Sequence, residues 1–510
     1  MSESVVSSIA VERVLTHPGV QPARHSLRLS WRHGQITGME PIASQIRPSI
    51  PADTLTGAVT SVLAMPPLAN AHDHGRGLPT LAFGAVDQAL ELWIPALRAQ
   101  PQVDPYLLTA YALAKLARSG VGSVVHCHNP QGSDPESLMQ EANSACRAAQ
   151  EVGLRMAFVV PLSDRNRLAY GGDGQVLAGL SAQQQQAIRN IWDQPPLPVA
   201  EQVALVPAIA ARCESERVSV QFGPIGPQWC SEPLLEAVAA ASAAQNRRVH
   251  MHLFETRYQR EWADATYPQG LLCYLDKIGL LSPRLTVAHG VWLRPDEWHL
   301  LAERGVIVSV NTSSNLRLRS GLAPLAPMLK AGIPVALGMD GMSLDDDEDA
   351  LRELRLTYAL HAGVGLDVAV TPAQIFAASM RHGTRAVTGL TTAGTLEVGS
   401  PADVLFLNYG SLSEDVLPDI CDETDLVLGR ARAEHVVGLI IGGQPVVQQG
   451  RVVGVDEAAI RTELIAQAQA ASAQVYALQP LVRSFQDQIR RFYAQGQHTQ
   501  RPAVAQEVTQ

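Results

Sequence analysis

The sequence predicts an α/β fold built around a (β/α)8 TIM-type barrel. From residue 61 to residue 390, short apolar runs alternate with stretches of helical periodicity, and this alternation is typical of a parallel sheet or barrel. Eight apolar runs can be assigned, which is the number of strands that closes such a barrel. They lie near residues 61–70, 122–128, 156–161, 217–222, 248–253, 285–289, 306–310 and 335–339.

The segment before the barrel, residues 1–60, is predicted to form a small β unit. Apolar and polar residues alternate from Ser26 to Trp31, and the turn-forming pair His33-Gly34 follows. This arrangement is typical of a β-hairpin.

Inside the barrel region, helical periodicity is clearest over residues 105–118, 134–152 and 233–245. The stretch from Gly172 to Arg212 is irregular and contains a run of glutamines and a Pro195-Pro196 pair. Long segments above a barrel often form lids, so this stretch is predicted to be an insertion that shapes the substrate entrance. A solvated surface helix with a glutamine-rich face is the alternative.

After the barrel, β-type patterning returns over residues 391–456. Residues 457–493 are rich in Ala, Gln, Leu and Arg with helical periodicity, which predicts a carboxyl-terminal helix or helix pair. The remaining residues, 494–510, are predicted to be a disordered tail.

His72 and His74, at the end of the first apolar run, form a candidate metal-binding pair. Alternate side chains of a strand share a face, so residues i and i+2 can project together toward one divalent ion. Taken alone, an ordinary pair of polar loop residues explains the motif equally well.

Three later apolar runs also end in residues that bind metals or transfer protons. These are His252 with Glu255, then His289, then Asp340. In a parallel barrel the carboxyl ends of all strands meet on one face, where active sites are built. Imidazoles and carboxylates gathered there suit zinc, with iron as the alternative.

These motifs, together with Ser314–Leu318 and Gly338–Gly341, resemble those of the amidohydrolase superfamily. The resemblance is to its aminohydrolase branch, which includes cytosine-deaminase-like, guanine-deaminase-like and triazine-hydrolase-like enzymes, and it covers residues 8 to 460. It implies that both chain ends, residues 1–60 and 391–456, join into one small β-sandwich beside the barrel. A homodimer is the assembly that it suggests.

The resemblance also assigns roles. It implies that one divalent metal ion is held by His72, His74, His252 and Asp340, and that Glu255 and His289 act beside it. Relatives with two metal ions usually bridge them with a carboxylated lysine on the fourth strand. This chain has no lysine between Lys115 and Lys277, so one metal ion is expected.

Hydrolytic removal of an amino group needs an activated water and a group that moves protons. A divalent ion lowers the pKa of bound water from about 15.7 to near 7, and a carboxyl group must protonate the ring nitrogen and the leaving amine. Glu255 fits this role. Because it follows His252 by three positions, strand alternation would direct it outward, so the strand is predicted to end near Phe254. Asp340 is expected to take the proton of the water, and His289 to hydrogen-bond the nucleophile or the oxyanion-like intermediate.

Five residues are candidates for substrate contacts, namely Arg76, His128, Gln228, Trp229 and Asn315. Arg76 can anchor an electronegative group or pair with a structural carboxylate. Relatives that recognise carboxylate-bearing nucleoside analogues often carry a histidine where this chain has Ile225. Because an apolar side chain cannot bind a carboxylate, the expected substrate is a compact heterocycle rather than an adenosine-type molecule.

Two other histidines have open interpretations. His126 shares a face with His128 at the end of the second predicted strand, where most relatives have no such pair. The two either contact substrate or satisfy hydrogen bonds in the core. His250 has the parity of His252 and is predicted to support the metal site or the core.

Composition limits the classes of partner. The net charge is −10, and no concentrated basic segment is present, so nucleic acid is not an expected partner. No apolar run of about 18 residues appears and the amino terminus lacks a signal-type segment, so no membrane partner and a cytoplasmic location are expected.

The function predicted from these observations is that of a metal-dependent hydrolytic deaminase. Its substrate would be a small amino-substituted heterocycle or cyclic amidine, which loses ammonia. One alternative is an amide or triazine-type hydrolase that uses the same mononuclear site. Another is a non-catalytic assembly protein. Such a protein would be expected to lack metal ligands, whereas this sequence retains all four metal-binding positions and both proton-handling residues.

Overall fold

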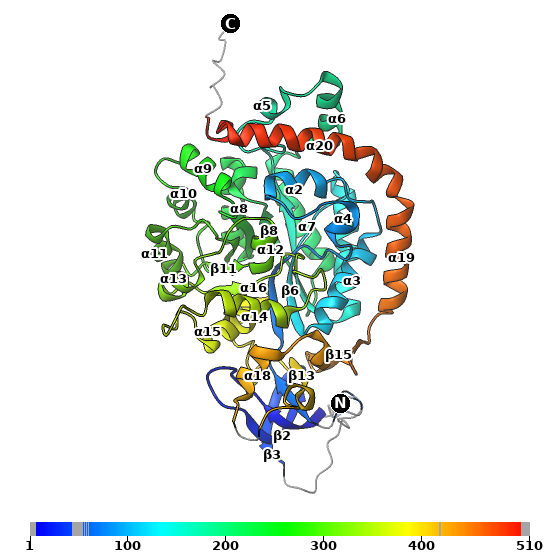
Figure 1. Ribbon diagram of the computed structural model, residues 1–510, viewed down its shortest axis with the longest axis vertical. Coiled ribbons are helices and arrows are strands. Elements are labelled where there is room, and N and C mark those ends of the chain that lie inside the picture. The colour runs from blue at the N-terminus through cyan, green and yellow to red at the C-terminus, as the bar shows by residue number, and fades with distance from the viewer. Residues whose placement is uncertain are drawn as a thin grey trace.

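Two eight-stranded sheets organise the molecule. The structure is a computed structural model that describes residues 7–42, 55, 57, 59, 61–417 and 420–500. A ring of helices surrounds the first sheet, the second sheet lies below it in Figure 1, and the last two helices run up one side and across the top.

The first sheet is the predicted parallel barrel. Its strands are β5 (Leu68–Asp73), β6 (Val121–Cys127), β7 (Arg155–Leu162), β8 (Val218–Pro224), β9 (Val249–Leu253), β10 (Leu285–His289), β11 (Ile307–Val310) and β12 (Val335–Leu337). They are hydrogen-bonded in chain order from β5 to β12. Beyond β12, the amides of Met339 and Asp340 donate to the carbonyl of His72 at 3.1 and 2.8 Å. These bonds connect the first strand to the end of the last one.

The first predicted barrel strand, residues 61–70, is wrong in its extent, because this run forms two strands. β4 (Val62–Met65) belongs to the second sheet, and β5 begins the barrel. Pro66 and Pro67 separate the two strands. Proline has no amide hydrogen and a fixed φ, so the chain leaves one sheet at this pair and enters the other.

The second sheet joins both chain ends, as the resemblance implied. Besides β4 it contains β1 (Ser7–Val14), β2 (Arg24–Arg32), β3 (Gln35–Pro41), β13 (Val404–Asn408), β14 (Val436–Ile441), β15 (Gln444–Gln448) and β16 (Arg451–Val452). Hydrogen bonds link all of them in the order β16-β15-β14-β13-β4-β1-β2-β3. The sheet has an apolar cluster of its own that includes Ile9, Leu29, Phe406 and Ile440.

The predicted helices between barrel strands are confirmed at α3 (Pro105–Arg118), α4 (Pro135–Val152) and α8 (Glu232–Gln245). Each follows a polar N-cap residue, Asp104, Asp134 and Ser231 respectively. The side chain of this residue accepts a hydrogen bond from a backbone amide of the first turn, which would otherwise have no partner. The other helices of the barrel region are α2 (Leu90–Leu97), α9 (Arg257–Thr266), α10 (Leu271–Lys277), α11 (Pro295–Glu303), α12 (Thr312–Arg317), α13 (Leu325–Lys330), α14 (Ala350–His361), α15 (Pro372–Ala377) and α16 (Gly383–Thr388). Helices α17 (Tyr409–Leu412) and α18 (Glu423–Arg430) follow β13.

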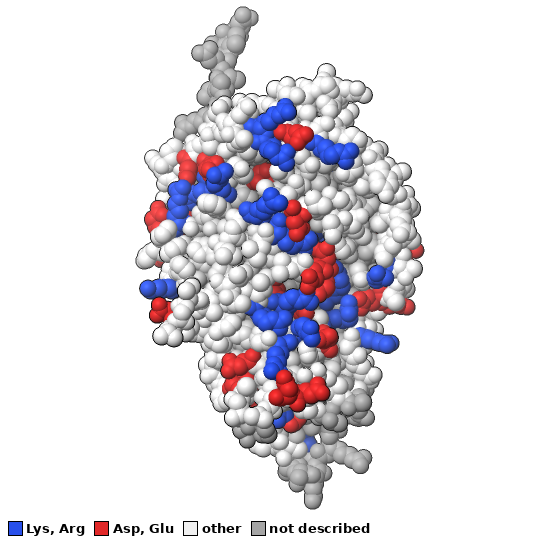
Figure 2. All heavy atoms as spheres, in the orientation of Figure 1, with Lys and Arg blue, Asp and Glu red and all other residues white. Residues whose placement is uncertain are grey.

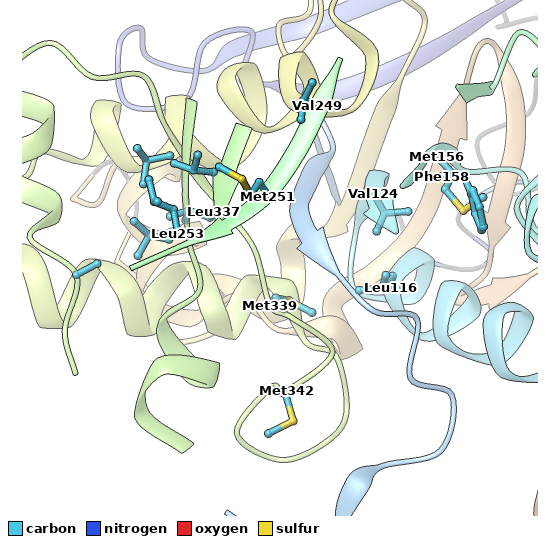
Figure 3. Packing of buried hydrophobic residues seen from close by; sticks show 14 of the residues in the cluster. Leu116, Val124, Met156, Phe158, Val249, Met251, Leu253, Leu337, Met339 and Met342 are labelled. Atoms are coloured by element: carbon cyan, nitrogen blue, oxygen red, sulfur yellow. The ribbon is translucent and has the colours of Figure 1, made fainter. Parts of the chain in front are cut away.

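Packing between strands and helices decides which side chains enter the barrel. Val249, Met251 and Leu253 of β9 belong to the main core cluster together with Leu116 of α3, and Figure 3 shows them among the buried residues of that cluster. Burying an apolar side chain of this size contributes about 1.5–3 kcal/mol. Because alternate residues of a strand face opposite ways, this packing places His250 and His252 on the interior side of β9.

The irregular stretch after β7 forms three helices, α5 (Asp173–Leu177), α6 (Ala182–Trp192) and α7 (Val199–Cys213). The glutamine run lies in α6, where Ser181 and Gln184 form a capping box. Trp192 at the end of α6 stacks on Phe485 of α20, with ring centroids 5.7 Å apart. In Figure 1, α5 and α6 lie at the top of the molecule beside α20.

The carboxyl-terminal extension is a helix pair, α19 (Glu457–Ala470) and α20 (Ser472–Ala494). A short 3-10 turn follows at Gln497–Thr499, and His498 in it is buried, 2.9 Å from Glu261. The predicted disordered tail is therefore wrong for residues 494–500, because aromatic packing and this contact hold them. Residues 501–510 of that prediction lie outside the described residues.

No helix in the described part of the chain has both the length and the apolar character needed to cross a bilayer. On the face shown in Figure 2, basic and acidic side chains are interspersed.

Candidate active site

Three of the residues at the barrel rim have left-handed backbone conformations. Phe254, His289 and Asp340 have φ values of +49°, +75° and +61°, which cost about 1–3 kcal/mol each in non-glycine residues and gather at functional sites. β9 ends at Leu253, so the predicted break near Phe254 is confirmed. The break turns Glu255 inward, where it is 2% exposed.

The side chains that the sequence motifs pointed to converge on one point. The Nε2 atoms of His72 and His74 lie 3.5 and 3.2 Å from Oδ1 of Asp340. In the set His72, His252 and His289, and again in the set His72, His74 and Asp340, one ligand atom from each residue lies within 4.8 Å of the others. These residues come from the ends of four barrel strands, β5, β9, β10 and β12, and the two sets meet at His72.

Further contacts orient these ligand atoms. Nδ1 of His72 lies 2.8 Å from Nε2 of His250, and Nδ1 of His252 lies 2.7 Å from the carbonyl oxygen of Ile225. Ser314, from the Ser314–Leu318 motif, donates to Oδ2 of Asp340 at 2.5 Å. Contacts of this kind fix the tautomer and the ring orientation of metal ligands. His250 therefore supports His72, in line with the prediction for it.

The residues present fit a divalent metal ion. Nε2 of His72 and Nε2 of His289 are buried and have no hydrogen-bond partner within the described residues. Burial lowers the pKa of His72 well below its usual value and that of His252 to about 4, so both rings are neutral at pH 7, which is the form that binds metals. Burial alone would raise the pKa of Asp340, but contacts with His72, Arg76 and His74 hold it well below its usual value.

Glu255 lies beside this cluster in a different environment. Its Oε2 is 3.8 Å from Nε2 of His289, and its amide donates to Oε1 of Gln259 at 2.8 Å. Burial, followed by the charges of Asp340 and Glu91, raises the pKa of Glu255 well above its usual value. The pKa values of two carboxyl groups near one position are therefore shifted in opposite directions, which is typical of acid/base pairs in enzymes.

The cluster lies at the inner end of a cavity of about 440 Å³, a volume typical of small-molecule sites. Its inner wall includes His74, His252, Glu255, His289 and Asp340. Its outer wall comes from α2, the loop after β7 and the end of α6, and includes Trp93, Leu97, Arg98, Arg165, Arg167, Ile191 and Trp192. Ile191 and Trp192 belong to the segment that was predicted to shape the entrance.

The five predicted substrate contacts have different outcomes. Trp229 lines the cavity, and its ring meets that of His252 edge to face at 6.4 Å. Arg76 also lines it, but its guanidinium donates to the backbone carbonyl of Asp340. Asn315 is buried and its Oδ1 lies 2.9 Å from Nδ1 of His289. Asn315 therefore orients a histidine, and the prediction that it contacts substrate has no support in this geometry.

The other two candidates point away from the main cavity. Nε2 of His128 lies 2.7 Å from Oε2 of Glu141, and His128 lines a smaller, adjoining cavity. Gln228 is 2% exposed and lies in the short turn Pro227–Trp229. Neither residue lines the main cavity, because the carboxylate of Glu141 and the turn direct them elsewhere.

Sequence reasoning missed Arg98, Arg165 and Arg167 of the outer wall. They belong to no motif, and only the folding of α2 and of the loop after β7 brings them together. It also missed Asn70, whose Oδ1 accepts from the amide of Met339 at 3.0 Å and so anchors the chain just before Asp340. Its place two residues before His72 was the only signal for it.

A further buried carboxyl group, that of Glu348, predicts a pH effect on stability. Burial, followed by the charge of Asp73, raises its pKa from 4.5 to about 8. Between these values the folded protein holds a proton that the unfolded chain has lost, so this group's contribution to the free energy of unfolding falls as pH rises from about 5 to 8. At pH 8, Glu348→Gln should therefore be more stable than the native protein by about 1–3 kcal/mol.

Urea unfolding at pH 5 and at pH 8 measures this effect. The difference between the variant and the native protein should be small at pH 5 and should grow toward pH 8. An equal difference at both pH values would show that Glu348 does not keep its proton in the folded state.

The protein is a parallel barrel that carries imidazoles and an aspartate at the carboxyl ends of its strands. This arrangement defines a class of barrel protein with a potential metal-binding site at the rim. The comparison with protein families agrees with this class and identifies the family. Residues 63–446 match the model of the amidohydrolase family, and the chain belongs to that family.

The curated relatives of this chain include deaminases of adenosine-type compounds. The chain is 36% identical over 195 residues to a 5'-deoxyadenosine deaminase of Methanothermobacter thermautotrophicus, a match that covers 38% of this chain and 45% of the relative. It is 28% identical over 414 residues to a 5-methylthioadenosine/S-adenosylhomocysteine deaminase of Moorella thermoacetica, covering 79% of this chain and 86% of the relative. The first match thus spans less than half of that relative's length.

Solved structures share the fold. An adenosine deaminase from Xanthomonas campestris with bound zinc has a TM-score of 0.72 at 23% identity, over 92% of this chain and 98% of that one. A triazine hydrolase from Arthobacter aurescens has a TM-score of 0.72 at 21% identity, over 92% and 99% of the two chains. The predicted resemblance to the amidohydrolases, including their deaminase and triazine-hydrolase members, is confirmed.

Proposed function

We propose that the protein is a metal-dependent hydrolytic deaminase that releases ammonia from a small amino-substituted heterocycle or cyclic amidine. The observation that carries this proposal is the convergence of His72, His74, His252 and Asp340 beside a buried carboxyl group, Glu255, whose pKa is raised. Membership of the amidohydrolase family and the deaminases among its relatives support it.

One divalent ion would be held by His72, His74, His252 and Asp340, and zinc is the ion that this set of ligands suits best, with iron as the alternative. A divalent ion in this position lowers the pKa of a bound water from about 15.7 to near 7. The zinc-bound adenosine deaminase that shares the fold supports the choice of metal. The fourth barrel strand, β8, contains no lysine, so the bridging residue of two-metal relatives is missing and one ion is proposed.

The residues around the ion divide the proton transfers. Asp340, which is ionised, accepts a proton from the attacking water. Glu255, whose pKa is raised by burial, would donate a proton to a ring nitrogen. It would then pass to the leaving amine the proton that Asp340 took from water, and recover its own from the hydroxyl group of the intermediate as that group becomes a carbonyl. His289 hydrogen-bonds the nucleophile and the oxyanion-like intermediate, and Asn315 keeps its ring in place.

A compact heterocycle remains the proposed substrate. Ile225 lines the cavity where relatives that bind carboxylate-bearing nucleoside analogues often have a histidine. Its carbonyl is occupied with Nδ1 of His252, and its side chain offers no hydrogen bond. Trp229 provides an aromatic surface on which a planar ring can stack. We propose that the partner is a small molecule rather than nucleic acid or a membrane. We also propose that the protein acts in the cytoplasm as a homodimer.

Ammonia release across a panel of aminopurines, pterins, aminopyrimidines and aminotriazines tests the proposal. Release of one ammonia per product from at least one compound, abolished by a chelator and restored by zinc, is the expected result. Release of a different leaving group from a triazine, or cleavage of an amide without ammonia, would favour the alternative hydrolase. No turnover of any compound by the metal-loaded protein would favour the non-catalytic alternative.

A further inference from the structure

His74 differs from the other histidines of the metal site in the contact of its second ring nitrogen. Nδ1 of His72, His252 and His289 each lies within hydrogen-bond distance of a protein group. Nδ1 of His74 is buried and has no such partner among the described residues. Histidines that bind a metal almost always donate this second nitrogen to a carboxylate, a carbonyl or a water. His74 therefore needs a partner.

A small side chamber adjoins His74. It has a volume of about 40 Å³ and its polar lining includes His74, Arg76, His126 and His128. A water needs only about 10–15 Å³ of such volume together with two or more polar partners. The chamber therefore has room for more than one ordered water. It adjoins the main cavity, with which it shares the lining residues His74, Arg76, Gln100, Asn129 and Gln131, but it does not reach Trp229 or Ile225.

His126 presents two unsatisfied nitrogens at this chamber. It is 2% exposed, and neither Nδ1 nor Nε2 has a hydrogen-bond partner in the described part of the chain. An unsatisfied buried polar group costs about 1–3 kcal/mol. Arg76 also lines the chamber, and its Nε is likewise buried without a hydrogen-bond partner among the described residues. Several buried polar atoms thus share one small space.

Packing fixes the position of the His126 ring. The ring stacks on Phe158, with centroids 5.7 Å apart, and it lies against Gly75, the neighbour of His74. A Cβ atom at Gly75 would lie only 2.4 Å from Cε1 of His126, so this close approach requires the glycine, whose φ is +61°. His128, 5.7 Å away between centroids, is itself held by Glu141.

We propose that ordered water in this chamber bridges Nδ1 of His74 to the ring of His126, and that His126 is a positioning residue of the metal site. It fixes the tautomer and the orientation of His74, so that Nε2 of His74 faces the ion. The inference rests on the proposed metal-dependent function. It gives His126, which the proposed reaction does not use, a role in holding the metal.

Zinc affinity, measured by chelator competition on the reconstituted protein, tests the inference without reference to turnover. His126→Ala should bind zinc about 10–100-fold more weakly than the native protein, the usual effect of losing such a supporting group. At least one of His126→Asn and His126→Gln should recover most of this affinity, because the two amides place a polar atom near the positions of Nδ1 and Nε2. The visible spectrum of the cobalt-loaded protein should change in His126→Ala and return in the recovering variant.

His382→Ala is the matched control. His382 is a partly buried histidine, and its Nδ1 lies 2.8 Å from the carbonyl oxygen of Val335, at the beginning of β12 and away from the rim. Its removal should leave zinc affinity unchanged. An equal loss of affinity in both variants, or an unchanged affinity in His126→Ala, would overturn the inference. A native protein that binds no divalent metal would overturn the proposed function instead.

Discussion

Replacing Glu255 with glutamine should lower kcat by about 10²–10⁴-fold, the range for loss of a general acid or base, while zinc remains bound. The amide has nearly the same shape and can still meet Gln259, but it cannot carry a proton to the ring nitrogen or the leaving amine. Glu255 approaches His289 and is not among the ligand sets that surround the metal position. Initial rates of ammonia release, combined with elemental analysis of the same preparation, measure both properties.

Glu91→Gln is the control for this change. Glu91 is also a buried carboxyl group, it accepts from Thr256 at 2.5 Å, and burial also raises its pKa, but it does not line the main cavity. Its charge ranks after burial and Asp340 among the causes of the raised pKa of Glu255, so we expect its replacement to change kcat by less than about tenfold, well below the loss of a general acid or base. Loss of zinc in Glu255→Gln would contradict the assignment of Glu255 to proton transfer, and so would a kcat close to the native value.

Replacing His252 with alanine should remove the metal and, with it, essentially all turnover. His252 comes from a different strand than His72 and His74, and its ring lies 4.7 Å from the ring of His72 between centroids. Without it, the remaining ligands of the ion come only from the first strand and from Asp340. The expected metal content after dialysis falls from about one ion per chain to near zero.

His250→Ala separates the loss of a ligand from the loss of a supporting contact. His250 touches the cluster through Nδ1 of His72, so its removal should weaken zinc binding by about 10–100-fold without abolishing it at saturating zinc. If His252→Ala kept a full complement of metal, His252 would not be a ligand.

The sequence carries enough information to predict the barrel because each strand is a short apolar run at the correct interval. It also predicts the inward turn of Glu255, because a spacing of three residues after His252 is incompatible with continued strand geometry. The same strand parity directs His250 to the barrel interior, on the side of His252. These are local rules, and they need no knowledge of distant contacts.

Other features depend on tertiary contacts that no local rule describes. The Pro66-Pro67 pair divides one apolar run between two sheets, and hydrophobicity alone does not show this boundary. Asn315 supports His289 rather than substrate because α12 lies beside β10 at that point. His128 turns to Glu141, which lies on the following helix. The cavity arginines come from α2 and a loop, and their sequence positions are unremarkable.

The metal content of the purified protein tests the central claim most directly. Elemental analysis of native protein, loaded with zinc and freed of excess ion, should give about one ion per chain, because every candidate ligand group in the described residues shares His72 and β8 has no lysine to bridge a second ion. A stoichiometry of two tightly held ions, or of none, would contradict a mononuclear site at the rim of this barrel.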